Sequence, residues 1–433
     1  MTFRAPLIVS AEMGYGHLRP ALALAQQLEV DLYRAELPPI ALDHEVATWK
    51  RSRRLYEMIS RASQLPLVGG AFKAGLDTIT SIPRFHPNRD LTRADLGVRS
   101  LERLIGRGIG EGLVSRLKQT QEQLLTTFYA MALAADHHGY DRVWCVVTDT
   151  DCARVWAPRQ AQHTRIRYLA PSQRVRRRLE AYGVPAGQIH LTGFPLPPSL
   201  LGGRQLPTLR ENLARRLHRL DPKGRFVAGY ERELRHFLPE WTGAIVEDSR
   251  PMLTFAVGGA GAQTELVHKF LPSLAPLLSG NRLKLCLIAG IRPEAAELFE
   301  RALTDLKVDF CLFGHGDAPV EIVIDDTFEG YAAQFNQAMA RTDILWTKPS
   351  ELVFFGALGL PLQLTRPIGV QEYYNRRWAT EHGVAMVRRP SRFVADWLVE
   401  LLNDGAYARA AWSGFMRLPK FGTYEIADLL SQP

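Results

Sequence analysis

The chain alternates short apolar runs with longer amphipathic stretches. Strands of parallel sheets are buried on both faces and read as continuous apolar runs, with helices in the connections. The order of runs therefore predicts an α/β protein built on parallel sheets. Strands are predicted at 6–10, 143–148, 166–170, 189–191, 252–257, 284–289, 320–324, 344–346 and 361–364. Helices are predicted at 20–28, 264–278, 331–340 and 424–430, and 101–135 is predicted to be mostly helical.

The most informative stretch is 347–375, with the sequence TKPSELVFFGALGLPLQLTRPIGVQEYYN. The strand before it ends in a turn, and Ser350 is predicted to cap a helix that carries Glu351 in its first turn. After a glycine and a further strand, Gln371 and Glu372 open a second helix. Two strand ends and two helix starts are thus predicted at one place. Open α/β sheets bind their ligands at such places.

The length of the chain predicts two domains. A single hydrophobic core rarely serves more than roughly 250 to 300 residues, and this chain has 433. Residues 201–250 are rich in proline, glycine and charge. We expect them to form a linker and the entry to the second domain. This leaves an N-terminal domain at 1–200 and a second domain from 251 onward.

Composition excludes several classes of protein. Apolar residues make up 46% of the chain and charged residues 23%, as in an ordinary globular protein. No run reaches the roughly 18 consecutive apolar residues that a membrane-spanning helix needs. The first strand leaves no room for a signal peptide, so we expect a cytoplasmic protein. The four cysteines follow no paired spacing and are predicted to be packing residues, with no metal site.

The net charge of +8 is concentrated in the N-terminal half. Residues 1–200 hold 26 Lys and Arg against 18 Asp and Glu, whereas 201–433 hold 27 of each kind. Either this half has an anionic partner, such as phosphates, nucleic acid or an acidic membrane surface, or its charge is only a solvated surface. A basic amphipathic helix at 46–65 either packs on its own domain or forms a lip that touches a membrane or a lipid acceptor. The arginine run at 174–178 predicts a solvated helix face.

A glycine-containing turn follows the first strand. Gly14 and Gly16 permit a tight turn, and His17 is then held at the mouth of the next helix, above the strand end. Arg19 occupies the third glycine position of a dinucleotide fingerprint, so that motif is not present. Asp149 ends the strand at 143–148, and a carboxylate there faces the crevice at the carboxyl end of a parallel sheet. We therefore regard His17 and Asp149 as candidate site residues.

A second glycine-rich loop lies between the strand at 252–257 and the helix at 264–278. Its small residues allow backbone N–H groups to approach an oxyanion, and the helix presents its positive end to a phosphate. The loop consists of Gly258, Gly259, Ala260, Gly261, Ala262 and Gln263. This pattern predicts a phosphate-binding loop.

Taken together and in this order, the motifs resemble those of GT-B glycosyltransferases. The group in question includes the lipid-linked peptidoglycan N-acetylglucosaminyltransferase and the diacylglycerol glycosyltransferases. The stretch GYGHLRPALALAQQL resembles the acceptor loop and first helix of the family. The stretch VVTDTDCARVW, followed by RRRLEAYGVPAGQIHLTGFPL, resembles the family's segment that leads up to the linker. The stretch VGGAGAQ resembles the family's loop for the donor phosphates, and GLPLQLTRPIGVQEYYN resembles its loop for the donor sugar. The resemblance covers most of the chain from Ile8 to about Val387, but the middle linker and part of residues 80–135 have no counterpart in it.

The resemblance implies two Rossmann-like domains whose parallel sheets face each other across a cleft. It implies an acceptor-binding domain at 1–200 and a nucleotide-sugar-binding domain at 251–412. It also implies that a C-terminal helix within 413–433 returns to the first domain.

The implied activity is transfer of a sugar from a UDP-sugar to a hydroxyl acceptor, either a small molecule or a lipid. The displacement is expected to invert the anomeric centre and to need no metal and no cofactor. His17 is the candidate base because imidazole titrates near neutral pH, and Asp149 orients it or shares its role. The acceptor loop contains Gly14, Tyr15 and Gly16. The candidate donor-binding residues are Gly258, Gly259, Ala260, Gly261, Gln263, Ser350, Glu351, Gln371 and Glu372.

One position departs from the family. An acidic residue that holds the nucleotide ribose usually lies about seven residues before the proline that corresponds to Pro361. Phe354 occupies that position here. Glu351 lies one helical turn earlier and is the candidate replacement.

Two other functions stay open. A nucleotide-sugar 2-epimerase has the same two-domain plan and needs no acceptor, and a non-catalytic protein would bind the nucleotide sugar without turnover. Nucleic acid is not an expected partner, because the basic residues lack interleaved aromatics and no recognition module is visible. We expect peripheral association of the N-terminal domain with the anionic inner face of the cell membrane.

Overall fold

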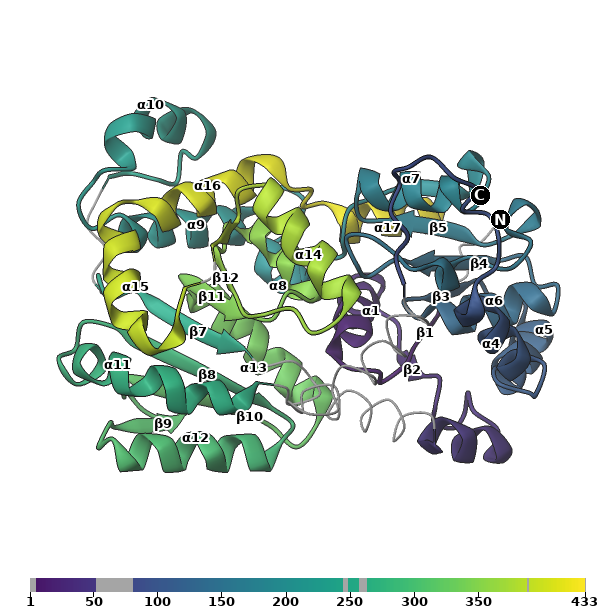
Figure 1. Ribbon diagram of the computed structural model, residues 1–433, viewed down its shortest axis with the longest axis horizontal. Coiled ribbons are helices and arrows are strands. Elements are labelled where there is room, and N and C mark those ends of the chain that lie inside the picture. Colours follow the sequence, from purple (N-terminus) through teal and green to yellow (C-terminus); the bar gives the residue numbers. More distant parts are fainter. Residues whose placement is uncertain (1–4, 52–80, 244–247, 257–262, 388, 433) are drawn as a thin grey trace. The chain divides into compact units, whose positions relative to one another are not determined.

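The computed structural model describes residues 5–51, 81–243, 248–256, 263–387 and 389–432, which form two compact units (Figure 1). Unit 1 comprises Met1–Pro198, Pro367–Asn375 and Pro419–Pro433. Unit 2 comprises Ser199–Arg366 and Arg376–Leu418. The predicted linker, 201–250, lies within the range of unit 2. Helix α8 (Pro198–Leu201) leads into it, and α9 (Pro207–Leu220) and α10 (Val227–Phe237) lie in it.

Unit 1 contains a six-stranded parallel sheet in the order β2-β1-β3-β4-β5-β6. From β1 the chain passes to β2 on one side and then returns to β3 on the other side of β1 (Figure 1). The carboxyl ends of β1 and β3 are therefore the topological switch point of this sheet. The strands are β1 (Leu7–Ser10), β2 (Leu32–Arg34), β3 (Leu124–Thr126), β4 (Val143–Val146), β5 (Arg167–Ala170) and β6 (Ile189–Leu191).

Helices cover both faces of this sheet because side chains alternate along each strand. Ile8 faces a cluster with α1 (Tyr15–Leu28) and α17 (Gly422–Ser431), the C-terminal helix. Its neighbours Leu7 and Val9 face the other cluster. The helices that contribute to this second cluster are α4 (Leu96–Ile105), α5 (Glu111–Thr120), α6 (Tyr129–His137) and α7 (Gln173–Ala181).

Unit 2 contains a seven-stranded parallel sheet in the order β13-β12-β11-β7-β8-β10-β9. Its switch point lies between β7 and β11, because the chain leaves β7 toward β8 and later returns on the opposite side. The strands are β7 (Met252–Ala256), β8 (Lys284–Gly290), β9 (Phe310–Leu312), β10 (Val320–Ile324), β11 (Ile344–Thr347), β12 (Leu362–Leu364) and β13 (Ala385–Met386).

The helices of unit 2 pack on this sheet through large aromatic side chains. Phe270 of α11 contacts Phe255 and Trp346, which are register partners on β7 and β11, with ring centroids 4.9 Å away in both cases. The helices are α11 (Val267–Ser279), α12 (Pro293–Asp305), α13 (Phe328–Arg341), α15 (Val394–Asn403) and α16 (Ala406–Arg417). A further helix, α14 (Val370–Glu381), begins in unit 1 and ends in unit 2.

Both units thus have the Rossmann-like architecture that the sequence predicts, and the GT-B fold class is confirmed. The cleft between the sheets stays a prediction. The sequence missed β2, β3, β9 and β13, which have two or three residues each and are too short to show a period of their own. Among the described residues, no helix is both long enough and apolar enough to cross a bilayer.

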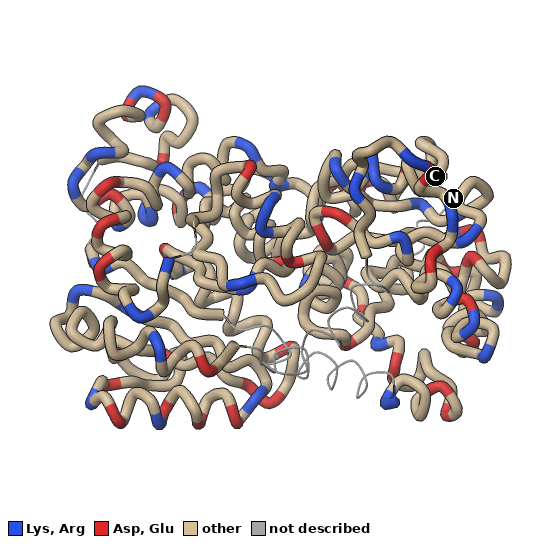
Figure 2. The backbone as a smooth tube through the Cα atoms, viewed as in Figure 1, with Lys and Arg blue, Asp and Glu red and all other residues tan. Residues whose placement is uncertain are grey.

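One arginine of the run on α7, Arg178, departs from the expected solvated face, whereas Arg177 is exposed as predicted (Figure 2, where Lys and Arg are blue). Arg178 is buried and forms two hydrogen bonds with Asp151, of 2.8 and 2.9 Å. Its guanidinium also lies over the ring of Phe85, 3.9 Å from the centroid. This bidentate pair and the cation–π contact compensate the burial of both charges.

A second buried arginine ties α9 to the sheet of unit 2. Arg216 donates from Nε to the carbonyl oxygen of Thr342, 2.8 Å away. One of its terminal nitrogens donates to the carbonyl oxygens of Leu358 and Gly359, at 2.9 and 3.3 Å. Burial lowers the pKa of Arg216 to about 10, so the side chain remains charged at neutral pH. Without this guanidinium, the carbonyl oxygens of Thr342, Leu358 and Gly359 would lose their buried hydrogen-bond donor.

Replacement of Arg216 should therefore destabilise unit 2. We expect Arg216→Met to lower the free energy of unfolding by about 2 kcal/mol or more, since an unsatisfied buried polar group costs about 1 to 3 kcal/mol. Urea unfolding followed by circular dichroism measures the change. Arg215→Met is the matched control, because Arg215 is exposed on the same helix. An equal loss of stability in both variants would contradict the role of Arg216.

Candidate functional site

The first candidate site lies at the switch point of unit 1. After β1 the chain turns at Gly14, whose φ of 100° is in the left-handed region that favours glycine. Helix α1 then begins at Tyr15, which places Gly16 and His17 in its first turn. The predicted start near Pro20 is one turn too late, because the helix already forms before the proline. His17 stands at the helix mouth, beyond the end of β1, as the sequence predicts.

The imidazole of His17 is held through one of its nitrogens. Nδ1 lies 2.7 Å from the carbonyl oxygen of Thr127 and 3.2 Å from Oγ1 of Thr148. A carbonyl oxygen accepts hydrogen bonds and cannot donate, so Nδ1 carries the proton. In the neutral ring, Nε2 is then the unprotonated nitrogen, which is the one that accepts a proton. The structure thus sets His17 in the tautomer that a general base requires.

Thr127 holds the backbone of His17 as well as its ring. Its hydroxyl lies 2.8 Å from the carbonyl oxygen of His17 and 2.8 Å from Oγ of Ser10. The single hydroxyl proton goes to the carbonyl, so Ser10 donates the other hydrogen bond. Thr127 follows β3 and is fully buried. One residue next to β3 therefore fixes both the start of α1 and the orientation of the imidazole.

Aromatic rings surround the half-buried imidazole of His17. The centroids of Phe128 and Trp156 lie 5.2 and 6.2 Å from its own centroid. Tyr129 packs on Trp156 at 5.0 Å. These rings limit the movement of the imidazole on the side of the protein interior.

Asp149 lies three residues beyond the end of β4 and is half-buried. Its Oδ1 accepts a hydrogen bond of 2.9 Å from Nδ2 of Asn375. The other end of that amide accepts from the backbone N–H and the hydroxyl of Thr150, at 2.9 and 2.8 Å. The carbonyl oxygen of Thr127 accepts the hydrogen bond from Nδ1 of His17. The predicted roles of Asp149, in orienting the imidazole or in sharing the role of the base, stay predictions.

The second candidate site lies at the switch point of unit 2. The hydroxyl of Thr347 donates to the carbonyl oxygen of Ala256 over 3.0 Å and so ties the end of β11 to the end of β7. The predicted phosphate loop follows β7, and Gly258, Gly259, Ala260 and Gly261 lie outside the described residues. Gln263 is described and donates from Nε2 to the carbonyl oxygen of Arg366, 3.1 Å away.

Ser350 and Glu351 follow β11, as predicted, but the helix differs. It is a 3₁₀ helix, η5 (Glu351–Leu358), ended by Gly359 with a φ of 69°. Ser350 occupies the N-cap position, yet within the described part of the chain its side chain makes no capping hydrogen bond, so that prediction is wrong. Glu351 is only 5% exposed, and Phe354 is buried against Trp378 with ring centroids 5.2 Å apart. The acidic residue at this strand end is therefore Glu351.

Gln371 and Glu372 lie in the first turn of α14, as predicted. Oε2 of Glu372 accepts a 2.8 Å hydrogen bond from the backbone N–H of Ile368, which satisfies a donor at the helix start. Both residues belong to the segment Pro367–Asn375 of unit 1, whereas Gln263, Ser350 and Glu351 belong to unit 2. The candidate donor-binding residues are thus divided between the units.

Sequence reasoning missed several residues at these strand ends. Thr127 was missed because β3 was not recognised. In unit 2, Lys348 is half-buried directly after β11 and lies three residues before Glu351 in the sequence. Thr365 is buried directly after β12, and its hydroxyl has no hydrogen-bond partner among the described residues. The signal for both is a polar residue immediately after a predicted parallel strand.

Comparison with known proteins agrees with this architecture. No protein-family model matches the chain. Over 141 residues the chain is 26% identical to the processive diacylglycerol beta-glucosyltransferase of Bacillus pumilus (strain SAFR-032), an alignment that covers 29% of this chain and only 37% of that protein. The expected resemblance to this group is thus confirmed as a resemblance over part of the chain.

Solved structures match over nearly the whole chain. The S. aureus MnaA-UDP co-structure has a TM-score of 0.50 and 12% identity, and covers 97% of this chain and 94% of its own. The UDP-GlcNAc 2-epimerase from Neisseria meningitidis, bound to UDP-GlcNAc, has a TM-score of 0.50 and 12% identity, and covers 98% and 99%. At this identity the likeness shows the two-domain fold.

The tautomer of His17 is directly measurable. We expect ¹⁵N-detected NMR of the neutral ring to show a protonated Nδ1 and an unprotonated Nε2, with His17→Gln to assign the signals. Thr148→Val should leave the tautomer unchanged, because the carbonyl of Thr127 fixes it. A protonated Nε2 in the neutral ring would contradict the assignment.

Proposed function

We propose that this chain is a glycosyltransferase that moves a sugar from a UDP-sugar to a hydroxyl group of an acceptor. The observation that carries the proposal is the hydrogen bond from Nδ1 of His17 to the carbonyl oxygen of Thr127, which makes Nε2 the unprotonated nitrogen of the neutral imidazole. The base lies at the switch point of unit 1, and an acidic residue, Glu351, follows the switch-point strand of unit 2. Two switch points, one in each unit, suit a reaction with two substrates.

The proposed reaction is a direct displacement. Nε2 of His17 takes the proton of the acceptor hydroxyl, and the oxygen attacks the anomeric carbon of the sugar. The bond from this carbon to the diphosphate breaks, UDP leaves with the electron pair, and the configuration inverts. Glu351 would accept hydrogen bonds from the ribose hydroxyls. The positive charge of Lys348 would favour the leaving diphosphate without a metal.

Different comparisons support the proposed donor and the proposed acceptor. UDP as the nucleotide is supported by the likeness in fold to proteins whose structures contain UDP or UDP-GlcNAc. A lipid or membrane-associated acceptor is supported by the partial match to a diacylglycerol glucosyltransferase. Peripheral association with the inner face of the cell membrane belongs to the same proposal.

A UDP-sugar 2-epimerase is the second candidate, because the two solved structures described above are a UDP-GlcNAc 2-epimerase and a protein bound to UDP. An epimerase acts on the donor alone. The two functions are therefore separable by the requirement for an acceptor.

Incubation with a UDP-sugar should distinguish these functions. We expect UDP release that depends on an added hydroxyl acceptor and persists in the presence of a metal chelator, measured by coupled assay and by NMR of the products. The new glycosidic bond should have the inverted configuration. Formation of an epimerised sugar without an acceptor would favour the second candidate instead.

Two substitutions should separate the base from the donor site. We expect His17→Gln to lower kcat by about 100-fold or more, the usual contribution of a general base, with unchanged affinity for UDP. Glu351→Gln should instead weaken UDP binding about tenfold, since a hydrogen bond to a charged group contributes about 1.5 to 3 kcal/mol. Calorimetry and initial rates measure both. Full activity of His17→Gln would exclude His17 as the base.

A further inference from the structure

Two rows of side chains fix the first turns of α14 in unit 1. Val370 and Tyr374, one helical turn apart, pack against the core of this unit, and the hydroxyl of Tyr374 donates to the carbonyl oxygen of Ile82, 3.4 Å away. Gln371 and Asn375 form the neighbouring row, because residues i and i+4 lie on one face of a helix. This row joins a candidate donor-binding residue to Asn375, which is only 1% exposed.

The orientation of the Asn375 amide follows from its partners. The backbone N–H of Thr150 can only donate, so the amide oxygen must face it, at 2.9 Å. The hydroxyl of Thr150 donates to the same oxygen over 2.8 Å. The amide nitrogen then faces Asp149, whose Oδ1 accepts at 2.9 Å. Three hydrogen bonds from two adjacent residues thus hold one buried side chain of α14, and we call this arrangement the clasp.

The loop after β4 that supplies these partners is itself held by α7. Ser172, the N-cap residue of α7, donates to the carbonyl oxygen of Thr150 over 3.0 Å. The next residue, Asp151, accepts the two hydrogen bonds of the buried Arg178 on the same helix. The loop that binds Asn375 is therefore fixed at two successive residues.

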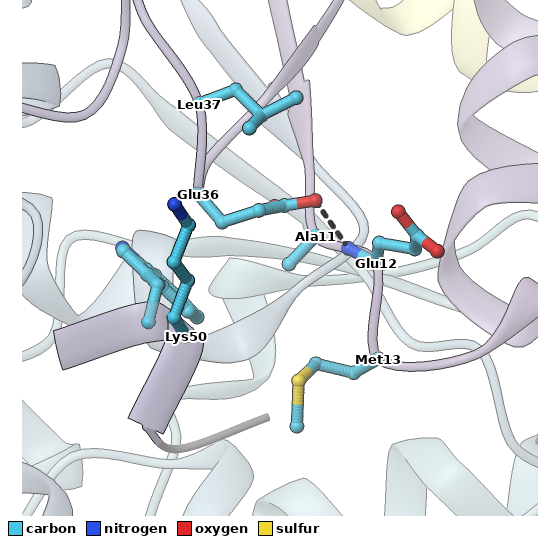
Figure 3. Close-up of a pocket in the computed structure, with 7 residues that line it drawn as sticks. Ala11, Glu12, Met13, Glu36, Leu37 and Lys50 are labelled. Atoms are coloured by element: carbon cyan, nitrogen blue, oxygen red, sulfur yellow. Dashed lines mark hydrogen bonds between the residues drawn. The ribbon is translucent and has the colours of Figure 1, made fainter. Parts of the chain in front are cut away.

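The proposed base rests on the same part of the chain. Oγ1 of Thr148, two residues before Thr150, lies 3.2 Å from Nδ1 of His17. The loop from β1 to His17 has a support of its own, because the backbone N–H of Glu12 donates to Oε1 of Glu36 over 3.0 Å, the dashed line in Figure 3. All these residues belong to unit 1. The base and the clasp are therefore parts of one compact unit.

The clasp bears on the chemistry through Gln371. Its side-chain amide both donates and accepts hydrogen bonds, as a sugar hydroxyl does. The other candidate in this turn, Glu372, already accepts the backbone N–H of Ile368. Rotation or sliding of α14 would displace Gln371, and a displacement of about 1 Å in a positioned group can cost about 100-fold in rate. A clasp one helical turn from Gln371 prevents such a displacement.

We propose that Asp149, Thr150 and Asn375 are positioning residues that hold Gln371 in a fixed relation to His17. The sugar of the donor is then held by the unit that carries the base. This inference rests on the proposed transferase function, in which Gln371 binds the donor sugar. It gives Asp149 a role that needs no proton transfer. It also makes recognition of the sugar separable from recognition of UDP, because UDP lacks the sugar that Gln371 would contact.

Hydrogen–deuterium exchange of the full chain, without ligand, tests the clasp itself. Asn375→Leu keeps the size of the side chain and removes all three hydrogen bonds. Amide exchange at 373–376 should become about tenfold faster, because this helical turn opens more often. The double substitution Asp149→Asn with Asn375→Asp should restore slow exchange, since the new carboxylate at 375 accepts from Thr150 and from the new amide at 149. Unchanged exchange in Asn375→Leu, or fast exchange in the double variant, would overturn the proposal.

Calorimetry with UDP, UDP-glucose and UDP-GlcNAc tests the effect on the donor. Asn375→Leu should weaken binding of the UDP-sugar about threefold to tenfold and leave the affinity for UDP unchanged. The double variant should recover the affinity. A merely structural defect would lower the number of binding sites and leave their affinities alone. An equal loss for UDP and UDP-sugar would refute the positioning role.

Two further variants support this test. Arg377→Met is the matched control, because Arg377 is exposed on the same helix, and it should change neither affinity. Thr150→Val loses only the hydroxyl bond, and it should weaken UDP-sugar binding about twofold to threefold. It serves as the test if Asn375→Leu does not fold, and an unchanged affinity in it would then refute the positioning role.

Failure of the transferase function would look different. If Asn375→Leu weakens UDP-sugar binding selectively but the wild-type chain transfers no sugar, the transferase function fails and the role of the clasp in sugar recognition remains. If sugar is transferred and Asn375→Leu has an unaltered KM for the UDP-sugar, the role of the clasp fails and the transferase function remains. If the wild-type chain binds neither UDP-sugar, both are overturned.

Discussion

The hydrogen bonds between Thr127 and His17 are the interaction on which the candidate active site depends. Thr127 is fully buried directly after β3, and it reaches both the ring and the backbone carbonyl of His17. This is only achievable because β1 and β3 are adjacent parallel strands whose carboxyl ends meet. The contact joins residues 110 positions apart in the chain and gives the imidazole a defined tautomer. The order of the strands in the sheet thus brings Thr127 to His17.

The same logic extends to the second unit, where Thr347 joins the ends of β11 and β7. The polar residues after these strands lie at the edge where open sheets bind ligands. Buried arginines stabilise the surroundings of both sites. Arg178 pairs with Asp151, two residues after Asp149, and Arg216 binds the carbonyls that end η5. Each charge is compensated by two or more hydrogen bonds, as burial of a guanidinium requires.

Sequence patterns predicted many of the strands, because strands such as β4, with the sequence VWCV, are continuous apolar runs. The position of His17 at a helix mouth and of Glu351 after a strand followed from the same patterns. The three residues of β3 carry no period of their own between two helices, so Thr127 was missed. Arg178 was expected to be solvated because its partners are distant in sequence. Local pattern predicts elements, whereas partners that are distant in sequence, such as Thr127 and His17, are only visible in three dimensions.

The central claim is that the imidazole of His17 takes the proton of the acceptor. Chemical rescue tests this most directly. Free imidazole added to His17→Ala should restore part of the transfer activity, in proportion to the concentration of its neutral form, while UDP binding stays unchanged throughout. Rescue that follows the neutral form would support proton transfer at this position. A variant that binds UDP normally and is either fully active alone or insensitive to imidazole and other small bases would contradict the account.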